Sequence, residues 1–248
     1  MIKPWGARTV LLRARVGSLN YNLHDALSDK DWKLFVLPSF DDLYNGTRYS
    51  YAHTSPQEDY TVHDIRRLAD LILKGNPYFL EVLYSRELAI HKPYYHLLEP
   101  LFHQREIITA AGRVHLYRSC LGTYQEKRKN LRKGTATTGT LVERYGYDTK
   151  EALHAYRLLD LLERYAACAW NFAHALSYDD PTTSILWAIK TGMIADGDID
   201  ALLEGKRRQI TSLAPQYDQP VSPAIADLVR QTIQTIVHHH LIHGDGHA

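Results

Sequence analysis

The chain of 248 residues has little cysteine, little net charge and no long apolar run. Its two cysteines, Cys120 and Cys168, lie far apart and form no CxxC motif. This pattern indicates neither a zinc site nor a disulfide framework, and it favours a reducing compartment. Lys and Arg number 29 against 28 Asp and Glu, so the overall charge is too small for a general nucleic-acid binder. A binding site for a polyanion would therefore have to be a local cluster of basic side chains.

The N-terminal segment MIKPWGARTVLLRARV has only a short apolar stretch, which Arg13 and Arg15 interrupt. A signal peptide or a membrane span needs a longer uninterrupted run. We therefore expect a cytoplasmic protein without a membrane partner. Apolar residues make up 45% and charged residues 23% of the chain, which is ordinary for a globular protein of one large domain or two small ones.

Hydrophobic periodicity divides the chain into a mixed part and a helical part. Alternating patterns predict strands over 9–16, 31–37 and 60–63, with a Gly-Ser turn and a short helix at 20–26 after the first strand and a loop or hairpin at 45–56. Helical patterns cover 64–73, 78–84, 105–132, 149–177, 181–191, 196–213 and 222–243. We expect an α+β fold, with a core at 1–92 and a helical part at 93–248 that pack together across a cleft.

One stretch rich in histidine and one rich in lysine and arginine are each explained without a functional site. Five histidines fall in the last eleven residues, where an exposed tail is favoured over a metal site: His238, His239, His240, His243 and His247. Five cations cluster at Lys127, Arg128, Lys129, Arg132 and Lys133. A plain charged surface is favoured there over a phosphate or RNA site. For His63, a role in packing and a contact with the nucleotide are equally expected.

A pair of carboxylates is the first chemical signal. Asp29 and Asp31 lie two residues apart at the start of a predicted strand, so alternation places both on one face. Such a pair is tolerated where a divalent cation neutralises it, and Mg²⁺ prefers carboxylate and phosphate oxygens. An isolated DxD is more often an exposed turn. Gly17 and Ser18 shift the balance, because a glycine permits close approach to phosphates and a serine hydroxyl can donate to them.

Three motifs, in the same order along the chain, resemble those of one known family. The segment GSLNYNLHDALSDKD at 17–31 resembles the GSxxYG…SDxDxxG signature of predicted nucleotidyltransferases of the DNA polymerase β superfamily, a family associated with RNA repair. The segment from Asp59 to Leu83 resembles that family's stretch ending in LxKGNPxxLExL, and YDTKEALHAYRLL at 147–159 resembles its YDxKxAxHxxRLL helix. The segment LWAIKTG at 186–192 echoes a further family pattern, LxxIxxG.

The resemblance implies transfer of a nucleoside monophosphate from a nucleoside triphosphate (NTP), ATP among them, with two Mg²⁺ or Mn²⁺ ions held by three carboxylates. It assigns the metal ligands and catalytic residues to Asp29, Asp31 and Asp59, with Glu58 as the competing third ligand. Asp59 could also draw the proton from an attacking hydroxyl. Gly17 and Ser18 are assigned to nucleotide binding.

The same resemblance assigns Lys150, His154 and Arg157 to nucleotide binding, on a helix face that looks into the cleft across from Gly17 and Ser18. Periodicity alone favours a solvated amphipathic helix, with one face packed and the other cationic.

The sequence departs from the family pattern at Asn22, which replaces a glycine, and at the segment 33–35. Both departures concern the shape of the pocket near the nucleotide. The acceptor expected from the resemblance is an RNA or tRNA end, with a protein or small-molecule hydroxyl as the alternative within the same chemistry. A nucleotide- or RNA-binding regulatory module without turnover is the alternative from another class.

Overall fold

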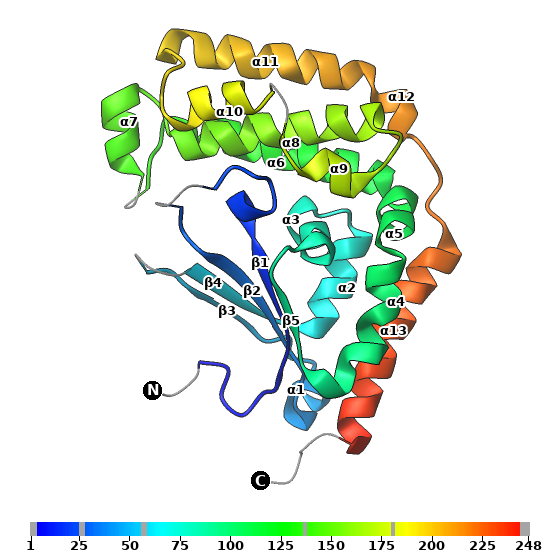
Figure 1. Ribbon diagram of the computed structural model, residues 1–248. Coiled ribbons are helices and arrows are strands. Elements are labelled where there is room, and N and C mark those ends of the chain that lie inside the picture. Colours follow the sequence, from blue (N-terminus) through cyan, green and yellow to red (C-terminus); the bar gives the residue numbers. More distant parts are fainter. Residues whose placement is uncertain (1–3, 25–27, 56–58, 136–137, 180–181, 244–248) are drawn as a thin grey trace. The chain divides into compact units, whose positions relative to one another are not determined.

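The computed structural model describes residues 4–24, 28–55, 59–135, 138–179 and 182–243 (Figure 1). The chain forms two compact units. Unit 1 comprises Met1–Gly112 and Val221–Ala248, and unit 2 comprises Arg113–Pro220. Unit 1 is therefore discontinuous in sequence, because the segment that forms unit 2 lies between its two parts.

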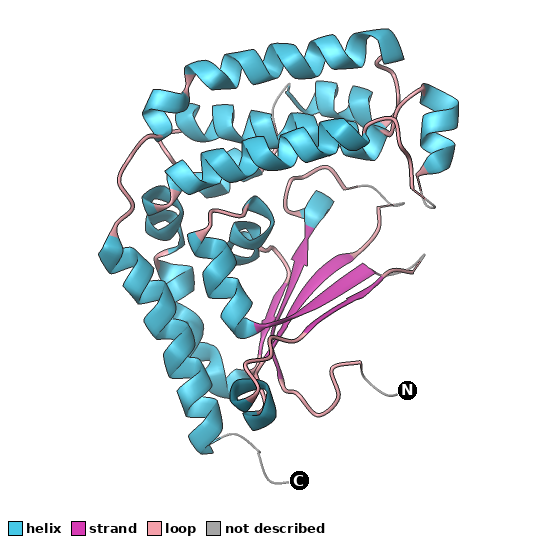
Figure 2. Ribbon diagram, turned by 180° about the vertical axis from the view of Figure 1, so that it is seen from behind, coloured by secondary structure: helices cyan, strands magenta, loops and turns pink. Residues whose placement is uncertain are grey.

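Unit 1 contains a five-stranded sheet, drawn in magenta in Figure 2. Its strands lie in the order β3 (Ser50–His53), β4 (Asp59–Asp64), β2 (Asp31–Val36), β1 (Val10–Val16) and β5 (Leu88–Ile90). The pairs β1–β2, β1–β5 and β3–β4 are antiparallel, whereas β2 and β4 are parallel. This one parallel pair aligns the first residues of β2 and β4 at the same edge of the sheet.

The two faces of the sheet are packed differently. Helix α2 (Ile65–Leu73) and the short helix α3 (Pro77–Leu80) cover one face (Figure 1), where the rings of Phe35 and Phe79 lie 6.1 Å apart between centroids. On the other face, a small core of Leu34, Val36 and Val62 is covered by partly buried apolar side chains, namely Trp5, Val10, Trp32, Tyr49 and Tyr60.

The other regular elements in the described part of unit 1 are helices. They are α1 (Phe40–Tyr44), α4 (Tyr95–His103), α5 (Arg105–Ala111), the long α13 (Pro223–His243), and the 3-10 helices η1 (Gly17–Leu19), η2 (Glu81–Tyr84) and η3 (Lys92–Tyr94). Helix α13 packs against α2, α4 and α5. Its buried residues include Val229, Ile233 and Ile236, spaced three and four apart as helical packing requires.

The C-terminal histidines lie mostly within α13. The side chain of His240 is half-buried, and its Nδ1 lies 3.0 Å from the hydroxyl of Tyr94. The exposed-tail interpretation is therefore wrong for His240, because helix α13 continues to His243 and His240 contacts Tyr94. His247 lies outside the described residues.

Unit 2 is built around α8 (Thr149–Ala167), which packs against α6 (Arg113–Asn130), α10 (Thr182–Lys190) and α11 (Asp196–Ser212). Three shorter helices complete the described part of the unit: α7 (Gly139–Tyr145), α9 (Phe172–Leu176) and α12 (Ala214–Tyr217). Because α8 has helical neighbours on several sides, it buries eleven residues rather than a single stripe: Thr149, Ala152, Ala155, Tyr156, Arg157, Leu158, Leu159, Asp160, Leu161, Leu162 and Tyr165.

The predicted α+β class is confirmed. The predicted helix over 149–177 is divided into α8 and α9, because Ala169 and Trp170 have positive φ values of 53° and 66°, which a helix cannot accommodate. The predicted helix at 20–26 is wrong for residues 20–24, where the chain turns after η1; residues 25–27 lie outside the described part. Strand β5 was not predicted. Among the described residues, no helix has the length and apolarity that crossing a membrane demands.

Candidate active site

The predicted carboxylates meet at one edge of the sheet in unit 1. Asp31 opens β2 and pairs in register with Asp59, the first residue of the parallel strand β4. On its other side Asp31 pairs with Val16, the last residue of β1. Residues opposite each other in adjacent strands point to the same face, so the side chains of Asp31 and Asp59 lie side by side. They lie next to the end of β1, where the chain continues into the Gly-Ser turn.

Gly17 and Asp31 are in close contact. A Cβ atom at Gly17 would lie 2.8 Å from Oδ2 of Asp31, which is shorter than real Cβ contacts allow. Gly17 also has a φ of 82°, in the left-handed region that favours glycine. Backbone conformation and the contact with Asp31 both favour glycine here, because a side chain would be strained and would displace the carboxylate.

The charge environment of Asp31 is strongly acidic. Burial, together with the negative charges of Asp59, Asp29 and Glu81, raises the pKa of Asp31 to about 6. A group of carboxylates that oppose one another's ionisation is stabilised by a bound cation. The donor set, with carboxylate oxygens only, suits a hard ion such as Mg²⁺.

The three predicted ligands differ in their surroundings. Asp31 and Asp59 are half-buried, and Oδ1 of Asp59 accepts a hydrogen bond of 2.9 Å from the backbone N–H of Ser55. Asp29 is exposed and precedes β2, so alternation within the strand does not set its direction. Glu58 lies outside the described residues. In the described part of the chain, no three or more His, Cys, Asp or Glu side chains are already grouped to hold a metal ion.

The Gly-Ser turn is a 3-10 helix, η1, followed by a tight reversal. The backbone N–H of Leu23 donates to the carbonyl of Ser18 at 2.9 Å, which closes the turn on itself. Asn22 has a φ of 61°. Asparagine is among the few non-glycine residues that adopt this conformation readily, so the replacement of the family's glycine preserves the backbone shape.

Glu81 is a functional candidate that the sequence did not single out. Its side chain is 1% exposed, and Oε1 accepts hydrogen bonds from the backbone N–H of Gly17 and, at 2.9 Å, from Nδ2 of Asn20. Oε2 accepts from the hydroxyl of Tyr21. The available signal was a carboxylate inside the otherwise apolar segment PYFLEVL, because a buried charge must have partners.

Lys33 lies on the same face of β2 as Asp31. Its Nζ is 4.9 Å from the ring centroid of Phe79. Burial lowers the pKa of Lys33, whereas the negative charges of Glu81 and Asp31 oppose that change. Lys33 thus supplies a positive charge beside the acidic edge, within the segment 33–35 that departs from the family pattern.

His63 is a packing residue. It is 9% exposed, and its ring lies 5.2 Å from that of Phe79 and 6.0 Å from that of Phe35, between centroids. Burial, with the charges of Lys33 and Arg67, lowers the pKa of His63 to about 4. Its ring is therefore neutral at physiological pH.

The three residues assigned to nucleotide binding on the predicted helix belong to α8 in unit 2, whereas Gly17 and Ser18 belong to unit 1. Lys150 is exposed, His154 is half-buried and Arg157 is 3% exposed. Burial and the neighbouring charge of Arg157 lower the pKa of His154 to about 3. The solvated face that periodicity alone favours is thus wrong for Arg157, and the contact of these three residues with nucleotide stays a prediction.

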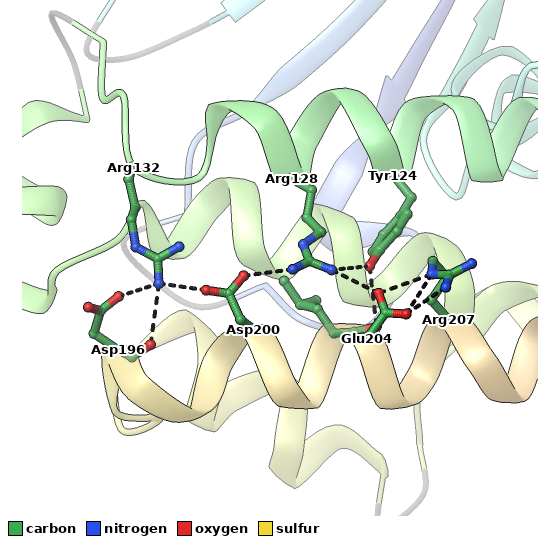
Figure 3. Close-up of polar contacts among 8 residues, drawn as sticks. Tyr124, Arg128, Arg132, Asp196, Asp200, Glu204 and Arg207 are labelled. Atoms are coloured by element: carbon green, nitrogen blue, oxygen red, sulfur yellow. Dashed lines mark hydrogen bonds and ion pairs between the residues drawn. The ribbon is translucent and has the colours of Figure 1, made fainter.

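The basic cluster at the end of α6 is largely paired within unit 2 (Figure 3). Arg128 contacts Asp200 and Glu204 of α11, each at 3.0 Å, and its guanidinium donates to the hydroxyl of Tyr124 at 3.2 Å. Arg132 contacts Asp200 at 2.7 Å.

Arg132 also contacts Asp196 at 2.8 Å, and Lys127 contacts Glu151 at 2.7 Å. Three of the five cations in the cluster therefore join helices of unit 2. This supports the ordinary structural explanation for the charge run.

The family comparison covers both units. The model of the RNA repair pathway DNA polymerase beta family matches residues 6–212. No curated protein matches the chain significantly. The matched range includes the Gly-Ser turn, both in-register aspartates, Glu81 and α8. The chain belongs to the RNA repair pathway DNA polymerase beta family.

Proposed function

We propose that this chain is a metal-dependent nucleotidyltransferase that moves a nucleoside monophosphate from an NTP to an acceptor hydroxyl and releases pyrophosphate. The observation that carries the proposal is the register of Asp31 with Asp59, next to the close contact of Asp31 with Gly17. Family membership supports the same reaction class.

The residues at this edge fit a divalent cation. Asp31 and Asp59 supply neighbouring carboxylates, and Asp29 adds a third charge that acts on Asp31. A bound Mg²⁺ or Mn²⁺ would neutralise these charges and those of the triphosphate, and would polarise the α-phosphate. Asp29, Asp31 and Asp59 are the proposed ligands.

The chain's own groups have separate roles in the proposed step. Gly17 and Ser18 hold the triphosphate, because the turn lets phosphate oxygens approach the backbone and the serine hydroxyl. The acceptor oxygen forms a bond to the α-phosphorus as the bond to pyrophosphate breaks, in line with the attack. Asp59 accepts the proton of the acceptor hydroxyl. Lys150, His154 and Arg157 are retained as proposed nucleotide contacts.

The proposed acceptor is an RNA end, tRNA included, in keeping with the family's description. A protein or small-molecule hydroxyl would use the same chemistry. The half-buried, charge-rich environment of Asp31 favours catalysis over a purely binding role, because perturbed carboxylates of this kind concentrate at active sites.

The experiment is an assay of pyrophosphate release. The purified chain is incubated with each NTP, Mg²⁺ or Mn²⁺, and one acceptor at a time: total tRNA, RNAs with defined ends, and a protein mixture. Metal- and acceptor-dependent release supports the transferase. Binding of NTP with no release under any of these conditions would instead favour a regulatory module.

A further inference from the structure

Glu81 connects two parts of unit 1 that are about sixty residues apart in sequence. It opens η2, directly after α3, and its carboxylate is buried beneath the Gly-Ser turn. Its hydrogen bonds reach Gly17 at the start of the turn, and Asn20 and Tyr21 at the end. Ser18 lies between these attachment points.

Asn20 reinforces the same arrangement. Its side chain is 2% exposed, and Nδ2 donates to the carbonyl of Arg15 at 3.1 Å as well as to Glu81. Its Oδ1 accepts from the backbone N–H of Arg86 at 3.1 Å. The turn is therefore held from β1 on one side and from the segment after η2 on the other.

Burying a carboxylate in order to hold a turn costs free energy. An ionised group removed from water is destabilising unless hydrogen bonds and an opposite charge compensate it. Glu81 has both, because three donors reach it and the charge of Lys33 interacts with it. Apolar packing alone would not fix the direction of the Gly17 amide or of the Tyr21 hydroxyl, whereas a carboxylate does.

We infer that Glu81 is a positioning residue that orients the Gly17–Tyr21 turn for the triphosphate. This inference rests on the nucleotidyl transfer proposed above. Glu81 binds Gly17, Asn20 and Tyr21, whereas Ser18, the proposed donor to the phosphates, lies between these attachment points. Loss of the Glu81 contacts therefore weakens NTP binding through the turn, without removing any group that contacts the phosphates.

The test compares three variants of the full chain. Glu81→Gln keeps an acceptor for Gly17 and removes the charge, and Tyr21→Phe removes one donor from the same carboxylate. Asp42→Asn is the matched control: Asp42 is 3% exposed, bonds Arg8 through both oxygens at 2.7 Å and caps α1. It is thus another buried, multiply bonded carboxylate of unit 1.

Two measurements separate positioning from general stability. KM for NTP should rise roughly 10-fold in Glu81→Gln, the amount expected for about one lost charged hydrogen bond, and rise less in Tyr21→Phe, with kcat changed less than KM. Amide hydrogen exchange should accelerate in the peptide that covers residues 17–23. Asp42→Asn should change neither, even where its melting temperature falls as far.

The outcomes also distinguish this inference from the proposed function. If the wild type releases pyrophosphate and Glu81→Gln resembles Asp42→Asn in both KM and exchange, Glu81 is a structural residue and the inference is wrong. If the wild type neither releases pyrophosphate nor binds ATP in the presence of Ca²⁺, the proposed function fails. Hydrogen exchange at 17–23 then still decides whether Glu81 holds the turn, and unchanged exchange overturns that too.

Discussion

Oδ2 of Asp31 lies so close to Gly17 that a Cβ atom on residue 17 would be only 2.8 Å from it. The two residues can be this close because glycine has no side chain. The predicted phosphate-binding turn and the predicted metal-binding carboxylate therefore form one continuous surface.

Gly17→Ala should lower transfer activity strongly and also destabilise the fold. The new methyl group displaces the Asp31 carboxylate, and the positive φ adds a backbone cost of about 1 kcal/mol. Gly46→Ala is the control, because Gly46 has a φ of 65° but nothing within 4 Å of a Cβ. Activity and thermal unfolding of both variants check this. Equal activity in the two would show that the contact with Asp31 is unimportant.

Asp31→Asn should abolish transfer while the fold is retained. The substitution removes one charge where a cation is proposed to bind, and charge stabilisation at the α-phosphate matters most in the transition state. We expect a loss of at least ~10²–10³ in kcat, with a smaller effect on NTP affinity. Pyrophosphate release and a Kd for ATP, with circular dichroism as the folding control, measure it. Turnover at the wild-type rate would place the site elsewhere.

Ser18→Ala should have a milder effect that appears mainly as a raised KM for NTP. Only one donor to the phosphates is lost, and the proposed metal ions and the turn remain. Steady-state kinetics over a range of NTP concentrations distinguish the two parameters. A fall in kcat with unchanged KM would instead assign Ser18 to the transition state alone.

Asn22 can be tested by its backbone conformation. With a φ of 61°, Asn22→Ala should destabilise the chain by about 1 kcal/mol, because alanine is strained in the left-handed region. Asn22→Gly restores the residue typical of the family and should leave stability and KM near those of the wild type. Chemical denaturation gives the comparison. Equal stability of the alanine and glycine variants would mean that the turn relaxes.

His154 should make stability depend on pH. Its pKa in the folded chain is about 3, below the value of about 6.5 in an unfolded chain. Between these values only the unfolded chain binds the proton, so stability falls as pH drops from 6.5 towards 3, by up to about 1.4 kcal/mol per pH unit. Above pH 6.5 both states are neutral and the contribution is constant.

His154→Gln should reduce this slope, whereas the exposed His103, which lies 3.6 Å from Glu99, provides the control variant His103→Gln. Denaturation midpoints measured from pH 8 to pH 4 supply both slopes. Identical slopes in the wild type and His154→Gln would show that protonation of another group dominates.

The neighbouring positions of Asp31 and Asp59 could be predicted because the motifs that contain them are local, whereas the binding of a metal there stays a prediction. The DxD spacing, the Gly-Ser turn and the motif that contains Asp59 are each read from a few neighbouring residues, and the parallel register of β2 and β4 brings Asp31 and Asp59 together. The α+β class followed from the change of periodicity after His63, where the predicted strands give way to helices.

Other features depend on contacts between distant segments and could not be predicted. The burial of Glu81 depends on donors in the turn, and that of Arg157 on the helices around α8. Strand β5 has three residues, too few for a period to be recognised. Arg128 is separated by some seventy residues from the acidic side chains of α11 that neutralise it.

The discontinuity of unit 1 has a consequence for biosynthesis. Helix α13 is translated only after the whole of unit 2, a delay of roughly 5–20 s at usual elongation rates. During that time the side of α2 and α4 that α13 later covers is exposed on the nascent chain. The unit that carries the acidic edge is thus completed last, and its folding depends on a segment that unit 2 separates from the rest of the unit.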